Sequence, residues 1–166
     1  MSATRLTIRD GIVVGLIGYA TVAVFYSFFD LLAARDALFT VNLLGRAVFR
    51  GLRDPAILQF PLSLDTGAIF AYNALHLLLA LAIGLVVVTL VTFGDRSPER
   101  RRTVRIVIAA GFVVTVIVVG VLTAPMRPML PWWSIVFANA LSTFFAAVYL
   151  LSKRPALWSR WLPRRA

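Results

Sequence analysis

The chain alternates long apolar blocks with short polar stretches. Four blocks are long enough, at roughly 1.5 Å of helix rise per residue, to cross about 30 Å of hydrocarbon. This pattern predicts an all-α polytopic membrane protein that forms a single membrane domain over residues 1–166. The expected transmembrane helices cover residues 11–32, 67–93, 104–124 and 132–152.

The first apolar block follows Arg5 and Arg9, as it would in a secretory signal peptide. It continues to about Leu32, however, and is therefore longer than the apolar core of such a peptide. We expect this block to stay in the protein as a membrane helix.

The connection between the first two spans, residues 33–66, is too long for a turn and too apolar for a flexible loop. Thr40 suits a helix N-cap, and the stretch VNLLGRAVFRGLR that follows it mixes polar and apolar residues with a helical period. It predicts an amphipathic helix over residues 41–53 in the outer membrane interface. The polar face of this helix would consist of Asn42, Arg46, Arg50 and Arg53, spaced by four, four and three residues.

Charge supports a membrane location and indicates an orientation. The formal net charge is +10, but the arginines cluster at the ends of apolar blocks, and no basic stripe with interleaved aromatic residues suggests nucleic acid. The expected partners of these arginines are anionic lipid headgroups. The N-terminus, the second connection and the basic tail (residues 153–166) carry 2, 5 and 5 Lys and Arg, against 4 and 1 in the other connections. The positive-inside rule then predicts that both termini are cytoplasmic.

Two polar groups within the spans need an explanation. Asp30 closes the first apolar block, where an interfacial ion pair with Arg35 or a proton or cation entry site would justify a carboxylate. His76, the only histidine, shares one helical face with Tyr72 and Asn73. Asn73 lies at a depth similar to that of Asp30. We therefore expect interhelical polar contacts among Asp30, Asn73, His76, Asn139, Ser142 and Thr143, with the last three on the fourth span as partners of His76.

A cofactor site is the alternative for this histidine. His76 with Tyr72 and Asn73 could bind a haem or a quinone, or take part in a proton relay. A haem would need a second ligand, and the methionines Met126 and Met129 lie outside the predicted helices. No cofactor and no metal is therefore predicted.

Small residues indicate where helices can approach closely. Gly11 and Gly15 form a small-xxx-small pair in the first span, and Gly111 and Thr115 form another in the third. Such pairs show only that close packing is available.

The residues of common catalytic sites are missing. The chain has no cysteine, no Ser–His–acid set at matching depths and no paired intramembrane carboxylates. We therefore expect that the protein is not an enzyme.

The stretches FFDLLAARDALFTVNLLGRAVFRG and YNALHLLLALAIG resemble a pattern in small uncharacterised bacterial four-helix membrane proteins. The matching positions are Asp30, Thr40, Tyr72 and His76, and Val41 stands where many of those proteins have proline. The resemblance covers about half of the chain. It implies a four-helix architecture in a bacterial inner membrane and no particular activity.

The leading hypothesis for function is a non-enzymatic accessory or assembly subunit of a larger membrane complex. It rests on the absence of a recognisable set of catalytic residues from the sequence, together with helix faces of polar and small residues that suit protein contacts. The alternatives are a haem- or quinone-associated redox subunit that uses His76, and a small oligomeric channel or transporter lined by Asn73, His76, Asn139 and Thr143. Self-association is a further possible use of the exposed faces.

Overall fold

A computed structural model describes residues 6–54, 58 and 61–157, and these residues form helices and no strand. The all-α prediction is confirmed: four helices are long and apolar enough to cross a membrane, with a shorter apolar helix between the first two. This architecture is compatible with an integral membrane protein. The elements are α1 (Ile8–Leu32), α2 (Phe39–Phe49), α3 (Thr66–Gly94), α4 (Pro98–Leu122), the 3-10 turn η2 (Ala124–Met126) and α5 (Trp132–Lys153).

Polar side chains fix where several helices begin. At the start of α1, the carboxylate of Asp10 accepts hydrogen bonds from the Thr7 N–H and hydroxyl, at 2.7 and 2.9 Å. At the start of α4, Ser97 is the N-cap and Pro98 the first residue, so the helix begins within the charged stretch that the sequence suggested as a loop.

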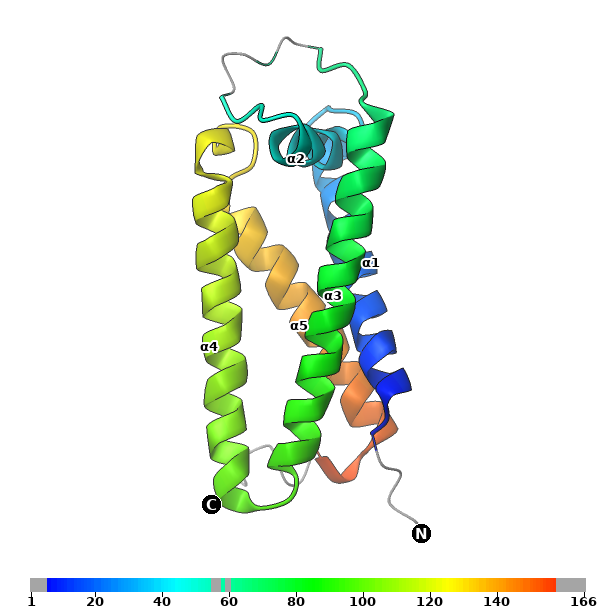
Figure 1. Ribbon diagram of the computed structural model, residues 1–166, viewed down its shortest axis with the longest axis vertical. Helices are drawn as coiled ribbons and strands as arrows, with labels where there is room; N and C mark the ends of the chain where they lie inside the picture. Colours follow the sequence, from blue (N-terminus) through cyan, green and yellow to red (C-terminus); the bar gives the residue numbers. More distant parts are fainter. Residues whose placement is uncertain (1–5, 55–57, 59–60, 158–166) are drawn as a thin grey trace.

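The long helices run between the two ends of an elongated bundle (Figure 1). The start of α1, the α3–α4 turn and the end of α5 lie at one end, which we call the basic end. An ion pair between Arg154 and Asp95, 2.6 Å long, joins α5 to that turn. At the opposite end, the α2 end, helix α2 lies across the bundle beside η2.

Helices α1 and α3 cross in close contact because glycines remove side chains from the crossing. A Cβ atom on Gly84 would lie 2.5 Å from the Gly15 nitrogen, and one on Gly15 would lie 2.7 Å from the Ala80 oxygen. The small pair predicted in the first span, Gly11 and Gly15, is thus part of this contact. Helix α5 packs on another side of α1, where Gly18 faces Ser142.

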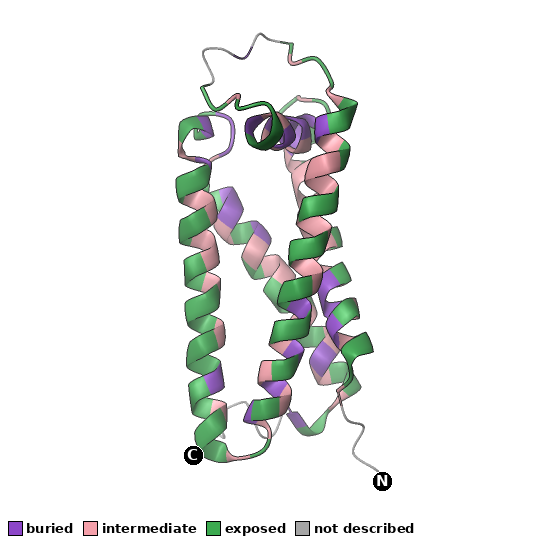
Figure 2. Cartoon of the chain, in the orientation of Figure 1, coloured by how far each residue is buried: buried purple, intermediate pink, exposed green. Residues whose placement is uncertain are grey.

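Helix α2 belongs to the core rather than to the surface. A Cβ on Gly45 would lie 2.5 Å from the Ala68 oxygen, so α2 also touches α3 at backbone distance. Leu43 is fully buried, and the buried residues at this end are coloured purple in Figure 2. The apolar cluster here consists of Phe39, Leu43, Ala47, Leu58, Met126 and Met129.

Helix α4 stands at the edge of the bundle and is exposed along most of its length (Figures 1 and 2). Val104 is its one buried residue. A Cβ on Gly111 or Gly120 would meet nothing within 4 Å in the described chain. The Thr115 hydroxyl donates to the Gly111 carbonyl at 2.8 Å, so the hydrogen bond of the second predicted small pair stays within its own helix.

Candidate functional site

The carboxylate of Asp30 anchors the start of α2. It is fully buried near the end of α1, and its two oxygens accept the Thr40 N–H and the Thr40 hydroxyl, each at 2.7 Å. Thr40 is in the first turn of α2, where backbone N–H groups have no partner inside the helix and favour a negative charge. Asp30 therefore ties α1 to the N-terminus of α2, and Thr40 lies two residues after the N-cap Leu38.

The expected ion pair between Asp30 and Arg35 is not formed among the described residues. The Arg35 guanidinium instead donates to the Met129 carbonyl at 2.8 Å and lies 4.7 Å from the centre of the Phe39 ring. The reason is local: the residues after α1 turn through a left-handed conformation at Ala34, with φ of 55°, and Asp30 is satisfied by Thr40. Arg35 thus links this loop to the turn that follows η2.

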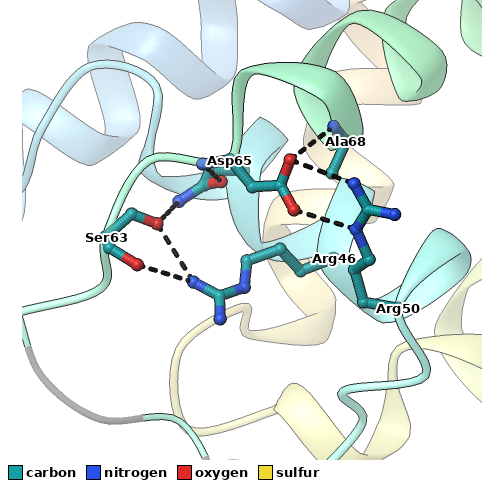
Figure 3. Close-up of polar contacts among 6 residues, drawn as sticks. Arg46, Arg50, Ser63, Asp65 and Ala68 are labelled. Atoms are coloured by element: carbon teal, nitrogen blue, oxygen red, sulfur yellow. Dashed lines mark hydrogen bonds and ion pairs between the residues drawn. The ribbon is translucent and has the colours of Figure 1, made fainter.

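The polar side of α2 binds protein groups, although Arg50 at its end remains exposed. The Asn42 amide donates to the Ser63 carbonyl at 3.0 Å, and its oxygen accepts the Asp65 N–H at 3.0 Å. Arg46 also donates to the Ser63 carbonyl, and Arg50 pairs with the Asp65 carboxylate at 2.9 Å (Figure 3). Three of the four residues predicted to share the polar face thus hold the chain that enters α3.

Asn42 differs most from its expected place, because it is almost completely buried. Arg53 lies beyond the end of α2, which covers Phe39–Phe49 rather than the predicted 41–53. Gly51, with φ of 74°, turns the chain out of the helix before Arg53 is reached.

Asp65 has two roles at the junction between α2 and α3. As N-cap of α3 it accepts the Ala68 N–H at 2.9 Å, and it pairs with Arg50. The hydrogen bond from Arg50, followed by the one from Ala68, lowers the pKa of Asp65 below its ordinary value of 3.8. The Asp65 carboxylate is therefore ionised at neutral pH, where it can pair with Arg50.

A cavity of about 120 Å³ lies under α2, between α1 and α3. It brings together Asp30, Tyr72, Asn73 and His76 from the predicted set. Thr40, which the sequence analysis grouped with Asp30, Tyr72 and His76, lines it as well. The other polar residues of its wall are Tyr26 and Ser27.

The histidine face of α3 meets α1, not α5. The Tyr19 hydroxyl donates to the Asn73 carbonyl oxygen at 2.9 Å, and the His76 ring lies 5.2 Å from the Tyr19 ring and 6.1 Å from the Tyr72 ring. The expected partners of His76 on the last span were wrong for a geometric reason. His76 lies on the same face as Gly84, and that face is pressed against α1.

The polar residues of α5 make local contacts instead. The Asn139 amide donates to the Ile135 carbonyl and the Thr143 hydroxyl to the Asn139 carbonyl, both at 2.8 Å. Ser142 faces Gly18 of α1. None of these three α5 residues lines the cavity that contains Asn73 and His76.

The methionines offer no second haem ligand at the cavity. Met126 and Met129 are buried in the apolar cluster around Leu43, and neither of them lines the cavity. The described residues contain no group of three His, Cys, Asp or Glu side chains that could hold a metal ion. The third methionine, Met1, lies outside the described residues, as does the end of the basic tail.

Sequence analysis did not identify Tyr19 and Tyr26 as site residues. Tyr26 hydrogen-bonds to Ser134 at 3.3 Å, which joins α1 to α5 beside the cavity. The available signal was their spacing: residues 19, 23, 26 and 30 follow one another by four, three and four, so the tyrosines share the helical face of Asp30.

No family model, curated protein or solved structure matches this chain.

Proposed function

We propose that this protein is a non-enzymatic accessory or assembly subunit of a larger membrane complex, and that α4 contacts the neighbouring polypeptide. The observation that supports this proposal is that α4 is less buried than the other helices of the bundle. In α1, α2, α3 and the inner face of α5, small and polar residues contact other helices of the same chain. Helix α4 leaves its own unused.

The small residues of α4 favour a protein neighbour over lipid alone. Gly111 and Gly120 are open, and a glycine within a helix costs about 0.5–1 kcal/mol relative to alanine. Against lipid that cost brings nothing, whereas against a second helix it allows close approach and van der Waals contact. Exposed branched side chains such as Ile117 and Val121 flank these glycines.

The proposed location is a bacterial inner membrane with the basic end in the cytoplasm. Among the described residues, the basic end carries more Lys and Arg residues than the α2 end, which supports this orientation under the positive-inside rule. At the α2 end, Arg35, Arg46 and Arg50 are engaged by protein groups. At the basic end, Arg100 and Arg102 are exposed at the start of α4 and suited to anionic headgroups.

Site-specific cross-linking tests the assignment of α4. The chain has no cysteine, so a Val114→Cys variant carries one benzophenone-maleimide label on α4. A Val24→Cys variant gives a matched label on α1, since the two valines are 57% and 58% exposed. Illumination in native membranes should give adducts with another polypeptide from position 114 and only lipid adducts from position 24.

A native mass measurement in mild detergent complements this test. A species much heavier than 18.3 kDa that contains other polypeptides supports the subunit assignment. A monomer or a pure homo-oligomer, together with lipid adducts alone from α4, overturns it.

A further inference from the structure

Three hydrogen-bonding groups at the cavity under α2 have no partner in the described chain. They are the His76 imidazole, the Tyr72 hydroxyl and the Ser27 hydroxyl, and all three residues line the cavity. Neighbouring polar groups are satisfied: Asp30 binds Thr40, Tyr26 binds Ser134, and Asn73 binds Tyr19. Unpaired polar groups at membrane depth are costly, so these three require a ligand or water.

The charge of the cavity wall favours a neutral ligand. Among the described residues, no Lys or Arg lines the cavity, and an anion would face the Asp30 carboxylate. A cation would find only that carboxylate, both of whose oxygens are already occupied by Thr40. The remaining groups are neutral donors and acceptors, which suit carbonyl and hydroxyl oxygens.

The size and the lining of the cavity favour one ring. A cavity of about 150 Å³ in another protein holds a benzene molecule, and this one measures about 120 Å³. Aromatic and aliphatic side chains, among them Tyr72, Val22 and Leu44, supply the apolar surface that a flat ring prefers. We propose that this cavity binds the ring of a neutral quinone or quinol headgroup, with His76 and Tyr72 hydrogen-bonded to one ring oxygen and Ser27 to the other.

Binding can be measured on the purified full chain in detergent by saturation-transfer NMR, with methyl-1,4-benzoquinone as the probe. The absence of cysteine removes thiol addition, the usual side reaction of such a quinone. We expect saturable binding that weakens about three- to tenfold in His76→Phe and in Tyr72→Phe, since each loses a hydrogen bond. The matched control Thr143→Ala removes an exposed hydroxyl on α5 and should bind normally.

A third variant tests the cavity itself. Ala23 lines it from α1, so Ala23→Leu fills the space and should abolish binding while the helical circular dichroism is kept. If Ala23→Leu fails to fold, Tyr72→Phe, which keeps the ring, still decides the question. Binding that Tyr72→Phe and His76→Phe leave unchanged overturns the proposal, as does equal binding of toluene, which cannot form hydrogen bonds, or no binding at all, which leaves water as the occupant.

This inference is independent of the role proposed for α4. The cavity lies between α1, α2 and α3, and the binding assay uses the isolated chain. Failure of the α4 cross-linking test would leave quinone binding intact, and loss of quinone binding would leave the α4 adducts unchanged.

Discussion

Gly84 and Gly111 lie in neighbouring membrane helices, but Gly84 is closely packed and Gly111 is not. Gly84 on α3 is pressed against the backbone of Gly15, whereas Gly111 on α4 has nothing within 4 Å of where its Cβ would be. Both glycines belong to small faces that the sequence makes available. The difference shows that a small face indicates a possible contact, and only the fold decides whether the chain fills it itself.

The same contrast separates the two regions as wholes. The packed region, formed by α1, α2 and α3, combines backbone contacts with side-chain hydrogen bonds that join different helices. In α4 the hydroxyls of Thr103 and Thr115 bond to carbonyls of their own helix. Substitutions in the packed region should therefore lower the stability of the isolated chain, and those on the exposed side of α4 should mainly change its assembly.

The largest effect is expected from a single added methyl group. Gly84→Ala places a Cβ 2.5 Å from the Gly15 nitrogen and forces α1 and α3 apart, which should lower the free energy of unfolding by about 1–3 kcal/mol. Gly111→Ala is the matched control and should be neutral or stabilising by up to about 1 kcal/mol. Titration with SDS in mixed micelles, followed by circular dichroism, measures both.

Equal destabilisation by the two alanine variants would contradict the comparison. The proposed role of α4 adds a second readout, because Gly111→Ala should weaken cross-linking to the neighbouring polypeptide while leaving the isolated chain intact.

The next effect concerns the attachment of α2. Asp30→Ala leaves the Thr40 N–H and hydroxyl without their acceptor in a buried place, which should cost about 2 kcal/mol. Hydrogen exchange should increase first in α2, because its anchor to α1 is lost. Asp30→Asn keeps one acceptor oxygen and should lose less. If α2 stays as protected in Asp30→Ala as in the unchanged chain, Asp30 is not its anchor.

The helices could be predicted from the sequence, because long apolar blocks have few alternatives in a membrane. The start of α4 could not be placed from hydropathy alone. Its first turns are charged, and the signals that begin it are the Ser97 cap and Pro98. The convergence of Asp30, Tyr72 and His76 on one region was only partly predictable, since periodicity gives the face of a helix but not the helix that covers it.

The polar face of α2 illustrates the limit most clearly. Periodicity correctly groups Asn42, Arg46 and Arg50 on one side, but the same pattern fits a face turned to water and a face turned to protein. The outcome depends on Ser63 and Asp65, which lie more than ten residues further along and supply the carbonyl and carboxylate groups. Their position is set by the backbone contact between Gly45 and Ala68.

A smaller effect is expected at the polar contact between α1 and α3. Tyr19→Phe removes the hydroxyl that binds Asn73, and contacts of this kind within membranes average about 0.6 kcal/mol. Thr115→Val on α4 removes a hydroxyl that bonds only to its own helix, and it should change the unfolding free energy less. The same SDS titration compares them, and a larger loss for Thr115→Val would reverse the assignment of the packed region.

The smallest effect concerns the exposed junction between α2 and α3. Because the pKa of Asp65 is lower in the folded chain than its ordinary 3.8, the stabilisation by the carboxylate is complete above that value and is lost as the pH falls through the folded pKa. The unchanged chain and Arg50→Gln should therefore differ in unfolding free energy at neutral pH and converge in strong acid. Salt should also reduce the difference, because the pair is exposed. A gap between the two proteins that persists in acid and in salt would mean that Arg50 acts by packing, in the manner of the buried contacts around Gly45, and not by its charge.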